Sequence, residues 1–139
     1  MTVIADTGFW LALANRKDAY HAKARSALVG LREPLISTWP VVTETCHLLA
    51  AQLGVESELM FIDAAHRGAF AIFDLAPSHL SRVRELMEKY RELPMDLADA
   101  SLVIVAEHIG SGRILSTDQR DFGPYRWKNR KPFRNLLTL

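Results

Sequence analysis

The chain has 139 residues, of which 49% are hydrophobic, and its net charge of +1 predicts no partner by itself. This length fits one domain over residues 1–139 with a sizeable core. No run of residues reaches the roughly 20 apolar residues of a membrane span. The single cysteine excludes an intramolecular disulfide. The first residues enter a strand-like run without a basic leader, so we expect no secretory signal and a cytoplasmic protein.

The first third of the chain predicts a strand followed by two helices. Residues 2–5 form a short apolar run that is typical of a buried strand. Residues 9–15 are apolar and predict a turn or a short helix, and residues 21–31 carry Ala, Leu and Val at helical spacing. Glu33 and Pro34 then end the helical pattern, because proline lacks a backbone donor and disfavours helix at the residue before it.

A second strand and a long helix follow. Residues 35–38 predict the strand, and Thr38 is placed to cap the amino terminus of the next helix. Pro40 then falls in the first helical turn, where a missing N–H is tolerated. We expect the helix to reach about residue 53 and to stop at Gly54, since glycine readily adopts the backbone conformation of a helix end.

The middle of the chain continues the alternation of helix and strand. Residues 57–67 predict a helix that ends at Gly68, and residues 69–75 predict a third strand. Ser78 is placed to cap a further helix that runs to about residue 90.

The last third predicts one more helix, a strand and a tail. Asp96 is expected to cap a helix over residues 97–109 that ends at Gly110. Residues 114–117 form a fourth apolar run. Two tail segments could add a fifth strand, residues 125–127 and 133–137. Strands that alternate with helices predict an α/β fold, a three-layer α/β/α sandwich around a parallel sheet of four to five strands.

Four acidic residues stand in apolar surroundings close to the predicted strand ends. Asp6 directly follows the first strand and Asp118 follows the fourth. Glu44 lies early in the helix after the second strand, and Asp99 lies in the first turn of the helix before the fourth. Because ligands of open parallel sheets bind beyond the carboxyl ends of strands, all four acids could converge on one edge of the sheet.

Each acid also has an ordinary structural explanation. Asp6 and Asp118 could cap the turns that follow them, with Asp121 as the capping partner of Asp118. Glu44 could extend from an apolar helix face into solvent. Asp99 could simply complement the positive end of its helix dipole.

Four clustered carboxylates would need a positive counterpart. Two like charges about 4 Å apart repel by about 4 kcal/mol at an effective dielectric of about 20, whereas a whole domain is stable by only about 5–15 kcal/mol. Among the lysines and arginines, only Arg120 lies close in sequence to one of these acids, Asp118. A divalent cation is the simplest counterpart, and oxygen ligands favour Mg²⁺ or Mn²⁺ over Zn²⁺. Asp96, one turn before Asp99, fits a cap better than a ligand but could still reach the site.

The carboxyl-terminal segment is basic and rich in aromatic residues. This composition suits contacts with a nucleic-acid backbone and stacking on bases, although a solvated basic surface explains it as well. The basic residues are Arg120, Arg126, Lys128, Arg130, Lys131 and Arg134, interleaved with Tyr125, Trp127 and Phe133.

These motifs together resemble the PIN-domain family and, more narrowly, the VapC-type toxin ribonucleases of type II toxin–antitoxin pairs. The resemblance covers essentially the whole chain, and Gly8 departs from the Ser or Asn that often occupies its position. The matching segments are Asp6-Thr7-Gly8, Glu44, Asp96-Leu97-Ala98-Asp99-Ala100 and Ser116-Thr117-Asp118-Gln119-Arg120-Asp121-Phe122.

The resemblance implies a Mg²⁺- or Mn²⁺-dependent endoribonuclease that hydrolyses RNA phosphodiester bonds. It also implies a parallel sheet in the order 3-2-1-4-5, a homodimer, and a cognate VapB-type antitoxin. The implied metal ligands and catalytic residues are Asp6, Glu44, Asp99 and Asp118, supported by Asp96, Thr117 and Asp121. We expect the RNA backbone to contact Arg120, Arg126, Lys128 and Arg130.

Two other functions stay open from the sequence. The chain could be a catalytically silent PIN-fold module that binds RNA or protein, although such a module has no reason to keep all four acids. A phosphoacceptor signalling domain would need a lysine at the end of the last strands, and none directly follows residues 114–117. Apolar residues in segments 41–53 and 59–61 exceed what one sheet face needs, which independently favours an interface and a homodimer.

Overall fold

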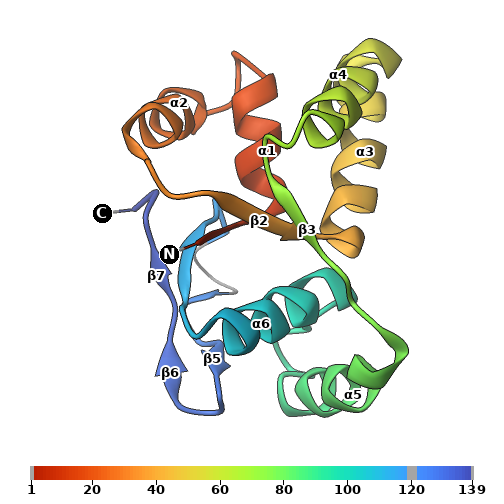
Figure 1. Ribbon diagram of the computed structural model, residues 1–139, viewed down its shortest axis with the longest axis vertical. Coiled ribbons are helices and arrows are strands. Elements are labelled where there is room, and N and C mark those ends of the chain that lie inside the picture. The colour runs from red at the N-terminus through yellow and green to blue at the C-terminus, as the bar shows by residue number, and fades with distance from the viewer. Residues whose placement is uncertain (1, 119–121, 139) are drawn as a thin grey trace.

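A parallel five-stranded sheet forms the centre of the protein, seen here in a computed structural model that describes residues 2–118 and 122–138 (Figure 1). Its strand order is β3-β2-β1-β4-β7, so the predicted order 3-2-1-4-5 is confirmed, with β7 as the fifth strand. The strands are β1 (Val3–Ala5), β2 (Leu35–Thr38), β3 (Ala71–Phe73), β4 (Arg113–Leu115) and β7 (Arg134–Asn135).

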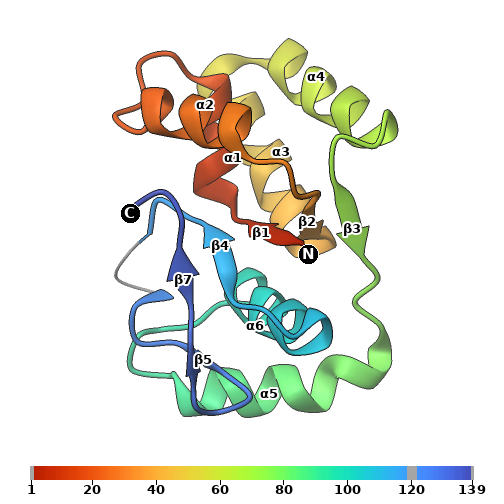
Figure 2. The same cartoon turned by 60° about the vertical axis from the view of Figure 1, so that its left-hand side comes forward.

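Helices cover both faces of this sheet, as the two views in Figures 1 and 2 show. One layer contains α1 (Thr7–Ala14), α2 (His21–Gly30), α3 (Trp39–Leu53) and α4 (Val55–His66). The other contains α5 (Leu80–Lys89), preceded by a 3₁₀ turn at Pro77–His79, and α6 (Leu97–Ile109). The predicted three-layer α/β sandwich is therefore confirmed. None of the helices in the described residues is long and apolar enough to cross a membrane.

Local capping chemistry sets the ends of the two helices that matter most for the site. Thr38 Oγ1 accepts a hydrogen bond from the Val41 N–H at 3.4 Å, and α3 ends at Gly54, whose φ of +98° favours glycine. Asp96 Oδ1 accepts from the Asp99 N–H at 2.8 Å, and α6 ends at Gly110. Both helices begin at the carboxyl ends of strands or beside them, so their first turns face the same edge of the sheet.

Two local predictions differ from the structure. Ser78 does not cap α5, because the chain first makes a 3₁₀ turn in which His79 Nδ1 accepts from the Ala76 N–H at 2.9 Å. In the tail, the segment around residues 125–127 does not join the central sheet. It forms an antiparallel hairpin of β5 (Arg126–Trp127) and β6 (Lys131–Pro132), and only the later segment supplies β7.

Candidate active site

Asp6 stands at the carboxyl end of β1 and is almost completely buried, with 8% of its surface exposed. Its Oδ1 accepts from the Thr7 N–H at 2.7 Å, and its Oδ2 accepts from the Ser116 hydroxyl at 3.0 Å. Asp6 therefore does cap α1, as its ordinary structural explanation required. The second oxygen nevertheless points to the end of β4, which brings Asp6 to the neighbouring strand end.

The electrostatic surroundings of Asp6 are unfavourable for its charge. Burial raises the pKa of this carboxyl to about 6, against the hydrogen bonds from Thr7 and Ser116, and the negative charges of Glu44 and Asp118 raise it further. In the part of the chain that the structure describes, no Lys or Arg forms an ion pair with Asp6 or Glu44. The predicted acids Glu44 and Asp118 thus each lie close enough to Asp6 to repel its charge.

Ser116 connects the ends of β1 and β4. Its hydroxyl donates to Asp6 and accepts from the Asp118 N–H at 3.0 Å. The main chain of Ser116 is held in turn by the Asn135 side chain on β7, with distances of 3.2 and 2.8 Å. Ser116 orients the buried carboxylate and fixes the turn that carries Asp118, whose side chain is exposed.

Thr117 lies between these two residues and packs directly on Gly8. A Cβ added at position 8 would collide with the Thr117 hydroxyl, and the Gly8 backbone is not in the left-handed region. A larger residue at position 8 would therefore fit only if the Thr117 side chain moved.

Asp99 reaches the same edge from the first turn of α6. It forms a reciprocal capping box with Asp96, in which the Asp96 N–H donates to Asp99 Oδ2 at 3.5 Å. Asp96 is thus a helix cap, as its position predicted. Tyr125, which is fully buried, donates its hydroxyl to the same Oδ2 of Asp99 at 3.2 Å. Tyr125 is a member of the site that the sequence did not reveal, because only the fold brings it to Asp99.

A cavity of about 680 Å³ adjoins the acids at the amino ends of α3 and α6. Glu44 and Asp96 both line it, so the half-buried Glu44 faces this space. The remaining wall is largely apolar and includes Trp39, Leu75 and Leu97. The cavity joins the two helix starts into one continuous surface beside Asp6. We call the carboxylates of Asp6, Glu44, Asp99 and Asp118 the acidic edge.

The donor atoms of the acidic edge suit a hard divalent cation. They are carboxylate oxygens with nearby hydroxyls from Ser116 and Thr117, and their mutual repulsion is relieved by a positive ion. As the side chains stand, no three His, Cys, Asp or Glu residues among those described converge closely enough to hold an ion.

The basic residues of the tail divide into different roles. The Arg126 guanidinium donates to the carbonyl oxygens of Gly123 and Tyr125 at 2.7 and 2.9 Å, so it closes its own loop. Lys128 and Arg130 are exposed on the hairpin turn, with the Lys128 ammonium 5.8 Å from the centre of the Trp127 ring. Two predicted site residues, Arg120 and Asp121, lie outside the described residues.

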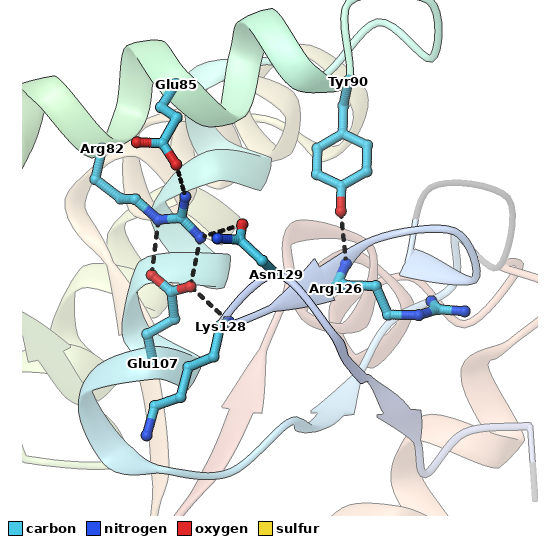
Figure 3. Close-up of polar contacts among 7 residues, drawn as sticks. All are labelled: Arg82, Glu85, Tyr90, Glu107, Arg126, Lys128 and Asn129. Carbon is cyan, nitrogen blue, oxygen red and sulfur yellow. Dashed lines mark hydrogen bonds and ion pairs between the residues drawn. The ribbon is translucent and has the colours of Figure 1, made fainter.

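A separate polar cluster fastens this hairpin to α5 and α6 (Figure 3). Arg82 donates through Nε and Nη2 to the two carboxylate oxygens of Glu107, at 3.0 and 2.6 Å, and also pairs with Glu85. Glu107 Oε2 accepts from the Lys128 N–H, and Asn129 Oδ1 accepts from Arg82. We call the set of Arg82, Glu85, Glu107, Asn129 and the Lys128 main chain the arginine cluster.

Comparison with known proteins assigns the family. The sequence profile of the PIN domain matches residues 3–126. Ribonuclease VapC26 of Mycobacterium tuberculosis is 26% identical over 124 residues, which cover 89% of this chain and 92% of that protein.

Two crystal structures share the fold. VapC20 of Mycobacterium tuberculosis, a sarcin–ricin loop cleaving toxin, has a TM-score of 0.80 at 19% identity, over 86% of this chain and 92% of that one. PAE2754 of Pyrobaculum aerophilum has a TM-score of 0.52 at 19% identity, over 99% and 94% of the two chains. With a family profile that spans nearly all of its central sheet and every residue of the acidic edge, the chain belongs to the PIN-domain family.

Proposed function

We propose that the protein is a Mg²⁺- or Mn²⁺-dependent endoribonuclease, the toxin of a VapBC-type toxin–antitoxin pair. The observation that carries this proposal is the buried Asp6 carboxyl, whose pKa is raised to about 6 and whose charged neighbours include Glu44 and Asp118. A buried carboxyl with a strongly perturbed pKa is typical of a functional site. Ribonuclease VapC26 is a relative over most of the chain, and its name supports the same reaction class.

In this proposal Asp6, Glu44, Asp99 and Asp118 hold one or two divalent ions. A divalent ion held there would supply Lewis acidity, which lowers the pKa of a water and offsets the negative charge of a phosphodiester. The protein's own part is to position ligands: Ser116 holds the Asp6 carboxylate, Asp96 holds the start of α6, and Tyr125 holds one oxygen of Asp99.

The tail supplies the contacts with the RNA backbone. Lys128 and Arg130 are exposed and carry charges that a phosphate can reach. Arg126 contributes mainly by closing the loop next to Tyr125. Arg120 keeps its proposed role as a contact for the RNA backbone. Asp121 and Thr117 keep theirs as supporting residues of the acidic edge.

The experiment that tests the proposal compares Asp6→Asn with the wild type on RNA in the presence of Mn²⁺. Asparagine preserves the size of the side chain and removes its charge, so cleavage should fall below detection while circular dichroism stays unchanged. Glu92→Gln, an exposed acid after α5, is the matched control and should cleave like the wild type. Undiminished cleavage by folded Asp6→Asn would sink the catalytic assignment.

The alternative is a catalytically silent PIN-fold module that binds RNA or protein. It has the same fold and the same acids but needs no ion. A calorimetric titration with Mn²⁺ separates the two functions, because a silent module shows no heat of binding that depends on Asp6.

Two partners and a location complete the proposal. An apolar strip on α4 and the end of α3 is exposed and suits a homodimer interface; it consists of Leu53, Val55, Leu59, Met60 and Ile62. A monomeric mass in sedimentation at micromolar concentration would contradict this assembly.

The cognate partner would be a VapB-type antitoxin, recognisable as a short reading frame next to the gene. Both proteins would act in the cytoplasm.

A further inference from the structure

Trp39 is exposed in a way that the other two tryptophans are not. Its side chain is 54% exposed, whereas Trp10 and Trp127 are 8% and 6% exposed and pack in the core. Leu97, on the opposite helix start, is 43% exposed and lines the same cavity. Trp39 and Leu97 thus form an exposed apolar patch on one cavity, and such patches mark ligand-binding grooves.

The backbone presents Trp39 rigidly. Thr38, immediately before it, is fully buried and caps α3, and its hydroxyl lies 2.7 Å from the Ser101 hydroxyl on α6. Pro40, immediately after it, restricts the backbone further. The backbone that carries the indole is therefore fixed at the start of α3, next to α6, which favours a stacking platform.

The chemistry of the cavity selects the ligand. Trp39 and Glu44 lie on successive turns of α3 and line one cavity, so the indole shares this cavity with one member of the acidic edge. The polar side chains of the wall include His47 and the two carboxylates of Glu44 and Asp96, which disfavour a phosphate, whereas a flat, uncharged ring suits the apolar remainder. Stacking on an indole accepts any of the four bases, because every base has a π-face.

We propose that this cavity is a nucleobase-binding subsite in which Trp39 stacks an unpaired base next to the scissile phosphate, with Leu97 as the opposite wall. The subsite rests on the proposed ribonuclease function and adds a base contact, outside the acidic edge, through which the protein would hold its RNA. Trp39 is here a substrate-binding residue that sets which RNA conformation is accepted.

Tryptophan fluorescence tests the subsite directly. A short single-stranded oligoribonucleotide of mixed sequence, added in EDTA to prevent cleavage, should quench the emission of Trp39. An abasic oligomer of equal length and charge should not, because it offers phosphates without bases. Trp39→Ala should bind the oligoribonucleotide about tenfold more weakly, and Trp39→Phe should restore most of the affinity because phenylalanine also stacks.

Val29→Ala is the matched control, since it removes an exposed apolar side chain from α2, away from the cavity. It should leave affinity unchanged, and equal melting temperatures would show that each variant is folded. Equal affinity of Trp39→Ala and wild type, or equal quenching by the abasic oligomer, would overturn the subsite. Loss of binding to an antitoxin peptide with unchanged RNA affinity would overturn it in favour of a protein-docking role.

The outcome can be separated from that of the proposed function. Cleavage of RNA by the wild type in Mn²⁺, without base-dependent quenching, would remove the subsite and leave the ribonuclease. Base-dependent quenching that is lost in Trp39→Ala, without any cleavage, would keep the subsite and remove the ribonuclease.

Discussion

The acidic edge and the arginine cluster place carboxylates in opposite situations within one small protein. In the arginine cluster, Glu107 receives two hydrogen bonds from Arg82 and one from the Lys128 main chain, and Glu107 in turn raises the pKa of Arg82. At the acidic edge, Asp6 is buried beside other carboxylates, and its pKa is raised to about 6. Glu107 is paired with an arginine, whereas Asp6 is buried close to other carboxylates.

The two regions therefore contribute differently to the stability and to the activity of the protein. The arginine cluster ties α5, α6 and the hairpin together (Figure 3). Tyr125, which directly precedes the hairpin, contacts Asp99. The arginine cluster therefore stabilises the wall of the site. At the acidic edge, burial of the ionised Asp6 carboxyl opposes folding, and a perturbed carboxyl of this kind is typical of functional sites. Substitutions in the two regions should separate stability from activity.

The largest expected effect is on catalysis at the acidic edge. Asp99→Asn should lower the rate of RNA cleavage in Mn²⁺ by about a hundredfold or more, by analogy with the loss of one preorganised electrostatic contact. Glu107→Gln, assayed at a temperature where it is folded, should retain cleavage near the wild-type rate. Equal losses in both variants would mean that the two regions do not differ in function.

The second effect concerns the pH dependence of stability. The pKa of Asp6 is about 6 in the folded protein and about 3.8 in the unfolded chain, so ionisation of this carboxyl destabilises the folded state. The destabilisation is absent below about pH 4 and complete above about pH 6. Asp6→Asn should thus be more stable than the wild type at pH 7.5 without metal, by at most about 3 kcal/mol.

Urea unfolding at several pH values measures this difference. The stabilisation should shrink as the pH falls from about 6 to about 4. A difference that does not depend on pH would show that the Asp6 charge is not the cause.

The third effect belongs to the arginine cluster. Glu107→Gln should lower the free energy of unfolding by about 1–3 kcal/mol, because it leaves the half-buried Arg82 without its strongest partner. Urea unfolding in metal-free buffer measures the loss. An unchanged midpoint would show that solvent replaces this pair at no cost.

The smallest effect is expected at Tyr125, where the two regions meet. Tyr125→Phe keeps the ring in its packing and removes the hydroxyl that donates to Asp99, so cleavage should fall about tenfold, and the affinity for Mn²⁺ should fall with it. Tyr90→Phe is the matched control. Its ring packs on Tyr125 with centres 4.9 Å apart, but its hydroxyl accepts from the Arg126 N–H. It should lower stability by about 1 kcal/mol without reducing Mn²⁺ affinity.

Local chemistry made much of the fold predictable. Thr38, Asp96, Gly54 and Gly110 were identified as helix ends because caps act over a few residues. The alternation of elements predicted a parallel sheet, and the family resemblance supplied its order. The prediction that Ser78 caps α5 was wrong, because a 3₁₀ turn precedes this helix. A serine near the start of a helical segment does not show whether a 3₁₀ turn or an α-helix begins there.

The site was predictable only in part, for a physical reason. Asp6, Glu44 and Asp118 stand out as acids in apolar runs, and the structure brings them within electrostatic range of one another. The contact of Tyr125 with Asp99 joins residues 26 positions apart, and no sequence period announces it. The fit of Thr117 against Gly8 and the exposure of Trp39 likewise depend on the packed fold.

The most direct test of the account is a calorimetric titration of Mn²⁺ into three metal-free proteins: wild type, Asp6→Asn and Glu107→Gln. The wild type and Glu107→Gln should bind Mn²⁺ with the same affinity, and Asp6→Asn should lose this binding. Equal binding by Asp6→Asn and the wild type, or no binding by any of the three, would contradict the claim that the acidic edge is a divalent-cation site.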